Sequence, residues 1–183
     1  MLYHVSATPG LKILQPRISS HGKAYVYAID NLVTGLLFGA KKDDFDFLLD
    51  VDKDDTPVIY ECYPDAFSTI YRGKRCSVYE LMEEGFLRGV TGWDPELVRE
   101  TEAAVEKEYV IPDLYARLLE EEAKGNLIIH RYRQDPEYQE IISEHIKDRL
   151  IRFDLLEYFD TKDIRGEKYY RAIIDELKKP KTS

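Results

Sequence analysis

The sequence predicts an α+β protein, with short strands over residues 1–132 and helices after them. Two observations carry this prediction. Apolar and polar residues alternate with a period of two in several short stretches before residue 132, which is typical of strands with one buried face. Beyond the Asp135-Pro136 pair, apolar residues recur at helical spacing, which is typical of amphipathic helices. We therefore expect an α+β domain over residues 1–132 and a C-terminal helical extension over residues 133–183.

The composition is that of a globular protein with one main domain. The chain has 183 residues, of which 44% are hydrophobic and 33% charged, enough to bury a proper core. A net charge of -9 argues against general nucleic-acid binding, because contacts to phosphate need a basic surface. No apolar run reaches the length of a membrane span, and the first residues lack the order of a secretory signal. We therefore expect a cytoplasmic protein that does not bind membranes.

The first strand is predicted over residues 2–6. Period-two alternation places His4 and Ser6 on the same face, and Thr8-Pro9-Gly10 then ends the strand, because proline removes a ladder donor. His4 has two interpretations. It is either a half-buried histidine whose hydrogen bonds are satisfied within the fold or a group that binds a ligand.

A second strand is predicted over residues 24–29, followed by a helix to about Phe38 that Asp30 or Asn31 caps. Tyr25 and Tyr27 share one face of this strand. They are either ordinary strand aromatics or part of a binding surface. The loop before the strand brings hydrogen-bond donors together, which suits a phosphate as well as a solvated loop. These donors are Arg17, Ser19, Ser20, His21 and Lys23.

The middle of the chain is predicted to be mainly strand. Residues 58–63 alternate, and residues 69–72 and 77–81 indicate a β-hairpin around Gly73. Residues 96–102 also alternate, which would place Glu100 and Glu102 on one face. Residues 50–61 superficially match a calcium loop, but the position that needs glycine is Asp55. We therefore expect a polar hairpin or connector there and no metal site.

The remaining elements are a strand at residues 108–111, a helix with Pro112 at its first position that ends near Gly125, and a last strand within residues 127–132. Helical spacing follows after residue 135 and again over residues 168–177. The C-terminal helices can pack on the sheet, form a homodimer or contact a partner helix. Cys62 and Cys76 are expected to be reduced thiols, since they form no CxxC pair.

Three stretches together resemble the ADP-ribosyltransferase-like superfamily of the His-Tyr-Glu type. Residues 3–6 resemble its histidine-bearing first strand, and residues 26–31 resemble its second motif, a tyrosine strand that runs into a small-residue helix. Residues 96–102 lie where its third motif, a strand with a catalytic glutamate, is expected. The resemblance covers about the first 130 residues. It implies a split, bent antiparallel β-sheet with flanking helices, and a cleft that binds nicotinamide adenine dinucleotide (NAD) as a substrate.

The resemblance also implies roles for individual residues. The histidine would donate to a ribose hydroxyl, the tyrosine would stack on the nicotinamide, and the glutamate would stabilise positive charge on the ribose as nicotinamide leaves. Glu108 is a further candidate for the glutamate. The expected cofactor-binding residues are His4, Ser6, Arg17 and Tyr27, and the expected catalytic residues are Glu100 and Glu102.

Two alternatives stay open beside an enzyme that cleaves or transfers ADP-ribose. The first is a non-catalytic module of the same fold that binds a nucleotide or a protein. The second is an enzyme similar to the RNA 2′-phosphotransferases, which share this fold and surround a phosphate with arginines and histidines. Arg17 and His21 are the residues that would serve this second alternative. The resemblance does not name an acceptor for ADP-ribose.

Overall fold

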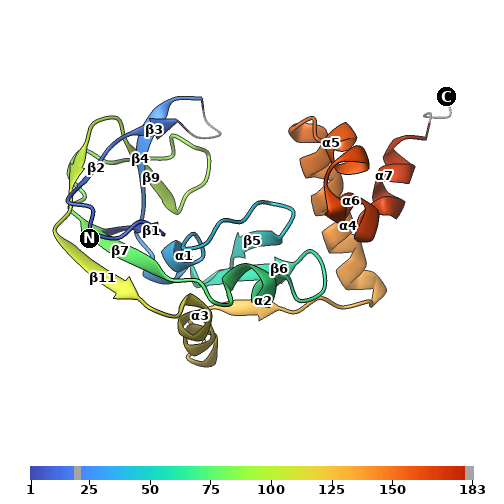
Figure 1. Cartoon of the computed structure of the whole chain (residues 1–183), viewed down its shortest axis with the longest axis horizontal. Helices are drawn as coiled ribbons and strands as arrows, with labels where there is room; N and C mark the ends of the chain where they lie inside the picture. The colour runs from blue at the N-terminus through green and yellow to red at the C-terminus, as the bar shows by residue number, and fades with distance from the viewer. Residues whose placement is uncertain (19–21, 180–183) are drawn as a thin grey trace. The chain divides into compact units, whose positions relative to one another are not determined.

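The computed structural model describes residues 1–18 and 22–179, and it has the predicted α+β fold with antiparallel sheets, helices and a helical C-terminal region (Figure 1). The chain forms two compact units. The first unit contains residues 1–41 and 68–128, and the second unit contains residues 42–67 and 129–183. The division into residues 1–132 and 133–183 stays a prediction.

The main sheet of the first unit has seven strands in the order β11-β7-β1-β4-β9-β8, with β3 also paired to β4. Each pairing for which a register is defined is antiparallel. A small separate sheet pairs β2 (Ile13–Leu14) with β10 (Ala103–Ala104). The strands of the main sheet are β1 (Leu2–Ser6), β3 (Arg17–Ile18), β4 (Ala24–Ile29), β7 (Cys76–Leu81), β8 (Leu87–Arg88), β9 (Glu96–Arg99) and β11 (Lys107–Ile111).

The main sheet opens between β1 and β4. β1 pairs with β7 along its whole length, from Leu2↔Leu81 to Ser6↔Ser77. Towards β4, the pair Tyr3↔Ile29 is the only one among the described residues. The two strands that carry His4 and Tyr27 therefore part beyond this pair, as the expected split in the sheet requires.

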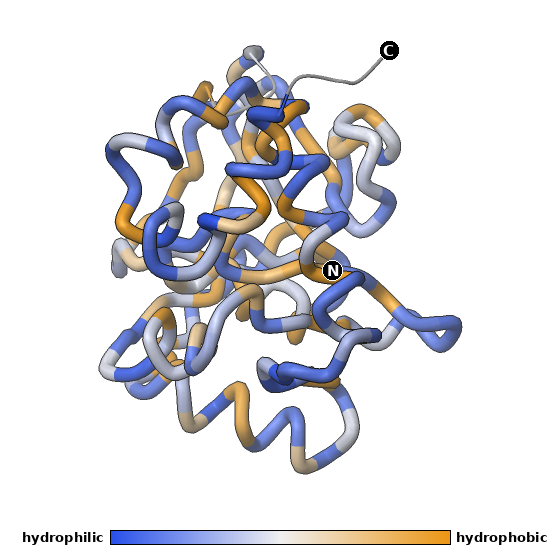
Figure 2. Tube along the Cα trace, turned by 90° about the vertical axis from the view of Figure 1, so that its right-hand side faces the viewer, coloured by the Kyte–Doolittle hydropathy of each residue, from blue (hydrophilic) through white to orange (hydrophobic). Residues whose placement is uncertain are grey.

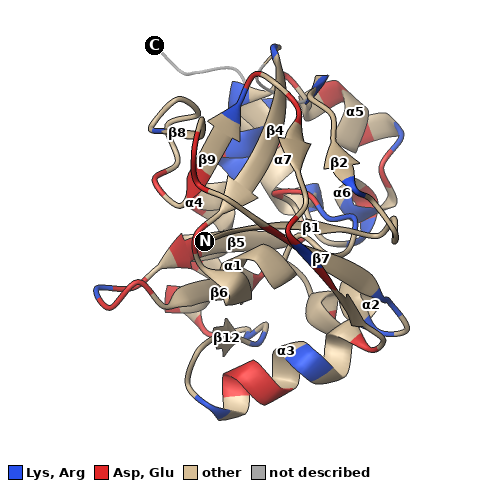
Figure 3. Ribbon diagram, turned by 90° about the vertical axis from the view of Figure 1, so that its left-hand side faces the viewer, with Lys and Arg blue, Asp and Glu red and all other residues tan. Residues whose placement is uncertain are grey.

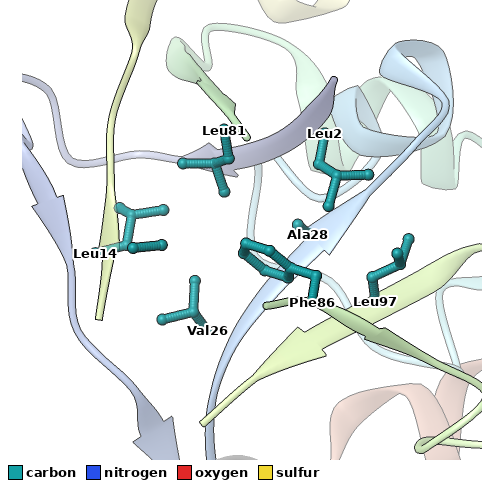
Figure 4. Packing of buried hydrophobic residues seen from close by; sticks show 8 residues of the cluster. Leu2, Leu14, Val26, Ala28, Leu81, Phe86 and Leu97 are labelled. Carbon is teal, nitrogen blue, oxygen red and sulfur yellow. The ribbon is translucent and has the colours of Figure 1, made fainter. Parts of the chain in front are cut away.

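A hydrophobic core fills the inner face of this sheet. Leu2 and Leu81 are at most 1% exposed, and the labelled side chains of the cluster point towards one another (Figure 4). Alternation explains the part of the set that comes from β4, because Val26 and Ala28 project from the same face of that strand. The members are Leu2, Leu14, Val26, Ala28, Leu81, Phe86, Leu97 and Ala103.

Two helices of the first unit begin at side-chain caps. Asn31 accepts from the Thr34 amide at 3.1 Å and starts α1 (Leu32–Leu36), which confirms one of the two predicted caps. Asp113 accepts from the Ala116 amide at 3.0 Å and starts α3 (Leu114–Ala123). The prediction that Pro112 is the first helical residue is wrong, because the carboxylate of the following residue makes the cap. α3 carries both acidic and basic residues (Figure 3).

The predicted hairpin around Gly73 is wrong. Residues 69–71 belong to helix α2 (Ala66–Tyr71), and β7 pairs with β1 and β11. The spacing of the buried residues Phe67 and Tyr71 explains the helix, because side chains four apart share one helical face. The Tyr71 hydroxyl also donates to the Leu37 carbonyl at 2.8 Å.

Among its described residues, the second unit combines a three-stranded sheet, in the order β12-β6-β5, with the four helices α4 to α7. The first of these helices begins at Pro136, which confirms the helix predicted after the Asp135-Pro136 pair, and Asp135 caps it by accepting from the Tyr138 amide at 3.0 Å. In the helices, hydrophobic and hydrophilic positions alternate along the trace (Figure 2). The elements are β5 (Phe47–Val51), β6 (Pro57–Glu61), β12 (Ile128–His130), α4 (Pro136–Arg152), α5 (Leu156–Thr161), α6 (Ile164–Lys168) and α7 (Arg171–Leu177).

Several carboxylates of the second unit accept hydrogen bonds or form ion pairs. In the turn between β5 and β6, Asp52 accepts from the amides of residues 54 and 56. Arg165 pairs with Asp43, Asp46 and Asp163 at 2.8, 2.9 and 2.9 Å. Within the described ranges, no group of histidine, cysteine and carboxylate side chains has the arrangement of a metal site. No helix in the same ranges is long and apolar enough to cross a membrane.

Candidate functional site

One cavity of about 490 Å³ brings together the four predicted cofactor-binding residues. His4 and Ser6 come from β1, Tyr27 comes from β4, and Arg17 comes from β3. All of them belong to the first unit. The volume lies in the range of small-molecule sites, about 300–1,000 Å³.

The His4 imidazole joins the two strands that part at the cavity. Its Nδ1 lies 2.8 Å from the Tyr27 carbonyl oxygen, and because a carbonyl only accepts, Nδ1 carries the proton. Burial lowers the pKa of His4, and the nearby charge of Arg17 lowers it further, while the bond to the carbonyl raises it. A neutral ring of this tautomer presents Nε2 as an acceptor. His4 therefore has both properties that the sequence left open: it is bonded within the fold and it lines a cavity.

The Tyr27 ring is held by a second aromatic ring of the same strand. Tyr25 also lines the cavity, and its ring lies edge to face with that of Tyr27, with centroids 5.9 Å apart. Phe38 lines the cavity as well and contacts Trp93, with ring centroids 5.8 Å apart. Aromatic side chains thus surround one part of the cavity.

Arg17 supplies positive charge at the cavity. β3 pairs with β4 at Arg17↔Tyr25, which places the guanidinium beside the tyrosine strand. Lys23 is also cationic, but its ammonium lies 2.6 Å from the Glu100 carboxylate, and this ion pair balances the charge of Lys23. Ser19, Ser20 and His21 lie outside the described residues, so the phosphotransferase alternative, which also uses His21, stays a prediction.

The two predicted catalytic glutamates lie beyond the end of their strand. β9 ends at Arg99, whose Nε donates to the Thr101 hydroxyl at 2.9 Å. The predicted strand over residues 96–102 is therefore too long, because the chain bends after residue 99. The prediction that alternation along this strand places Glu100 and Glu102 on one face is wrong. Neither glutamate is among the residues that line the cavity.

The surroundings of the two glutamates differ. Glu100 pairs with Lys23, whereas Glu102 accepts a hydrogen bond of 3.0 Å from the Gln15 side chain. Gln15 lines the cavity, so one neutral side chain connects Glu102 to it. Both carboxylates are exposed. Of the two glutamates, Glu102 is therefore the one that is hydrogen-bonded to a residue lining the cavity.

The sequence reasoning missed several residues of the cavity wall. Leu11, Ile13 and Leu14 line the cavity together with Gln15, and none of them was among the predicted site residues. Their place follows from the pairing of β2 with β10, at Ala103↔Leu14. Two short strands far apart in the sequence carry no local signal for such a pairing.

Comparisons of the chain with models of protein families, with curated proteins and with solved structures find no match.

Proposed function

We propose that the cavity of the first unit binds NAD and that the chain cleaves or transfers its ADP-ribose part, as its resemblance to the ADP-ribosyltransferase-like superfamily implies. One observation carries the proposal. His4, Ser6, Arg17 and Tyr27 were selected from the sequence on two separate strands and a loop, and all four line the same cavity.

The tautomer of His4 decides how it would bind a ribose. Nδ1–H is used by the Tyr27 carbonyl, so Nε2 would accept a hydrogen bond from a ribose hydroxyl. This direction is the reverse of the one expected from the resemblance. The lowered pKa of His4 keeps the ring neutral at neutral pH and so keeps Nε2 available as an acceptor.

The other residues would hold the nicotinamide and the pyrophosphate of the dinucleotide. The face of the Tyr27 ring would pack on the planar nicotinamide, and the contact with Tyr25 fixes the orientation of that ring. The Arg17 guanidinium would bind a phosphate oxygen through its fork of N–H donors. The bond between the nicotinamide nitrogen and ribose C1 would break, and nicotinamide would leave with the bonding electrons. Water, in cleavage, or the acceptor nucleophile, in transfer, would form the new bond to C1 and release a proton.

Of the two glutamates, we assign the stabilising role to Glu102. A carboxylate beside the developing positive charge on C1 lowers the energy of the transition state. The Glu100 carboxylate is already balanced by Lys23, whereas the partner of Glu102 is the uncharged amide of Gln15. Glu102 therefore retains the charge that this role needs.

Incubation of the purified chain with NAD and measurement of released nicotinamide tests the proposal. We expect release from the wild type and a loss of at least about 100-fold in Glu102→Gln. Glu100→Gln removes the same charge next to Lys23 and is expected to cost less. If the wild type neither releases nicotinamide nor binds NAD in calorimetry, the proposal is wrong.

A second candidate function is a non-catalytic module that binds a nucleotide. The observation in its favour is that both predicted catalytic glutamates bond to other side chains and that neither lines the cavity. Calorimetry separates the two candidates. NAD binding without nicotinamide release, unchanged in Glu102→Gln, would support the module.

A further inference from the structure

A segment without regular structure forms part of the cavity wall. Ala7, Thr8 and Leu11 line the cavity, and Gly10 adopts a left-handed backbone with φ of 77°. The segment Thr8–Leu11 lies outside the strands and helices. Backbone groups in such a segment need hydrogen-bond partners from elsewhere in the protein or from water.

Side chains from other strands supply these partners. The Tyr79 hydroxyl donates to the Thr8 carbonyl at 2.6 Å and accepts from the Leu11 amide at 3.3 Å. The Glu108 carboxylate accepts from the Gly10 amide at 2.9 Å. At the near end, the Ser6 hydroxyl accepts from the Thr8 amide at 3.1 Å. Four backbone groups within four residues are thereby fixed by three side chains.

Tyr79 and Glu108 belong to the same row of the sheet as His4. The register pairs His4↔Tyr79 between β1 and β7, and Glu108↔Tyr79 between β7 and β11. Residues that are paired in this way project from the same face of a sheet. The rings of His4 and Tyr79 have centroids 6.3 Å apart. Three neighbouring strands therefore place the histidine and the two residues that hold the wall in a single row.

The Tyr79 hydroxyl and the Glu108 carboxylate contribute little to pairing between the strands, since backbone groups make the hydrogen bonds between strands. Tyr79 is fully buried, and its hydroxyl has one proton, which the short contact to Thr8 takes. The Gly10 amide lowers the pKa of Glu108, and the Ser77 hydroxyl acts in the same direction, so the carboxylate is ionised at neutral pH. A charged acceptor makes the stronger bond to the Gly10 amide.

We propose that Tyr79 and Glu108 are positioning residues that hold the segment Thr8–Leu11 as a preformed wall of the cavity. A wall that is already ordered spares a ligand the entropic cost of ordering it. Glu108, which the sequence offered as a candidate catalytic glutamate, therefore acts through the segment. The ligand used in the test, NAD, rests on the proposed function, whereas the order of the segment does not.

The test compares Tyr79→Phe and Glu108→Gln with the wild type in two measurements. The first is hydrogen exchange of the Gly10 and Leu11 amides, and the second is the KM and kcat of nicotinamide release. We expect exchange of these amides and the KM for NAD each to rise about fivefold to tenfold, with kcat changed less than about twofold. Tyr79→Phe removes two hydrogen bonds to the segment, and Glu108→Gln replaces a charged acceptor of the Gly10 amide by a neutral, weaker one. Exchange of the β1 and β7 amides should stay slow, which shows that the variants are folded.

Two matched controls separate this effect from general effects of the substitutions. Glu106 is exposed and lies two residues before Glu108, so Glu106→Gln removes the same charge at a neighbouring position. Tyr109→Phe removes a hydroxyl that donates to Glu80. The pair Tyr109↔Val78 places that tyrosine on the other face of the sheet. Neither control should change the exchange of the Gly10 amide.

Unchanged exchange of the Gly10 and Leu11 amides in both variants would overturn the inference. A loss confined to kcat would also overturn it, because it would place the residues in the chemical step. If the wild type neither binds NAD nor releases nicotinamide, the proposed function fails, and the exchange measurement alone still decides whether the two residues hold the segment.

Discussion

The bond between His4 and the Tyr27 carbonyl gives a prediction about stability and pH. We expect His4→Ala to lower the free energy of unfolding of the first unit by about 2–3 kcal/mol at about pH 7.5, where the ring is neutral. About 1 kcal/mol is the loss of the 2.8 Å hydrogen bond. The rest, about 1–2 kcal/mol, is the loss of packing around a largely buried ring.

This penalty should shrink in acid. The pKa of His4 is lowered in the folded state, so below about pH 6.5 the unfolded chain binds a proton that the folded chain excludes. The wild type then loses stability, by at most about 1.4 kcal/mol per pH unit, until the pH falls below the lowered pKa. The alanine variant lacks this loss, so the difference between the two proteins decreases.

Urea unfolding followed by tryptophan fluorescence measures this difference. The chain has a single tryptophan, Trp93, which lies in the first unit. Wild type and variant are compared at about pH 7.5 and about pH 5, on either side of the ordinary histidine pKa. Burial also lowers the pKa values of His130 and His145, but both proteins keep these residues, so their effect cancels. A penalty that stays constant or grows in acid would refute the reasoning.

Three further substitutions test the fold. Leu81→Ala, at a fully buried core position, should cost about 2–5 kcal/mol in urea unfolding followed by Trp93 fluorescence, and a cost below about 1 kcal/mol would contradict the core packing. Gly39→Ala should cost about 1–3 kcal/mol in the same assay, because its new Cβ would lie 2.8 Å from the Cys76 sulfur; no cost would mean that the chain relaxes there. Asp135→Ala removes the cap of α4 and should cost about 1 kcal/mol in thermal unfolding followed by circular dichroism, whereas Asp135→Asn should restore most of the loss.

Local signals in the sequence predicted the elements whose partners are close in the chain. Alternation predicted β1 and β4, and the caps at Asn31 and Asp135 follow from side chains that bond within three residues. Helix α2 was mistaken for a strand, because residues 69–72 suit a strand and the deciding contact, from the Tyr71 hydroxyl to the Leu37 carbonyl, spans 34 residues.

In the candidate site, too, local patterns predicted some residues, and contacts between distant parts of the chain decided the others. Alternation on β1 and β4 predicted which faces carry His4 and Tyr27, and the structure brings both to one cavity. The wall segment and its supports were missed, because the contacts of Tyr79 and Glu108 with it span 68 to 98 residues. Register between distant strands decides those contacts, and a single sequence does not encode register in a readable way.

The ion pairs of Arg165 have a consequence for the order in which the chain folds during synthesis. Asp43 and Arg165 are 122 residues apart, and the second unit is assembled from residues on both sides of the stretch 68–128. A ribosome that has released only the first half of the chain therefore leaves Asp43 and Asp46 without their cation. Because long loops must close before such contacts form, the second unit should be the last to reach its native state, after the final helices have emerged.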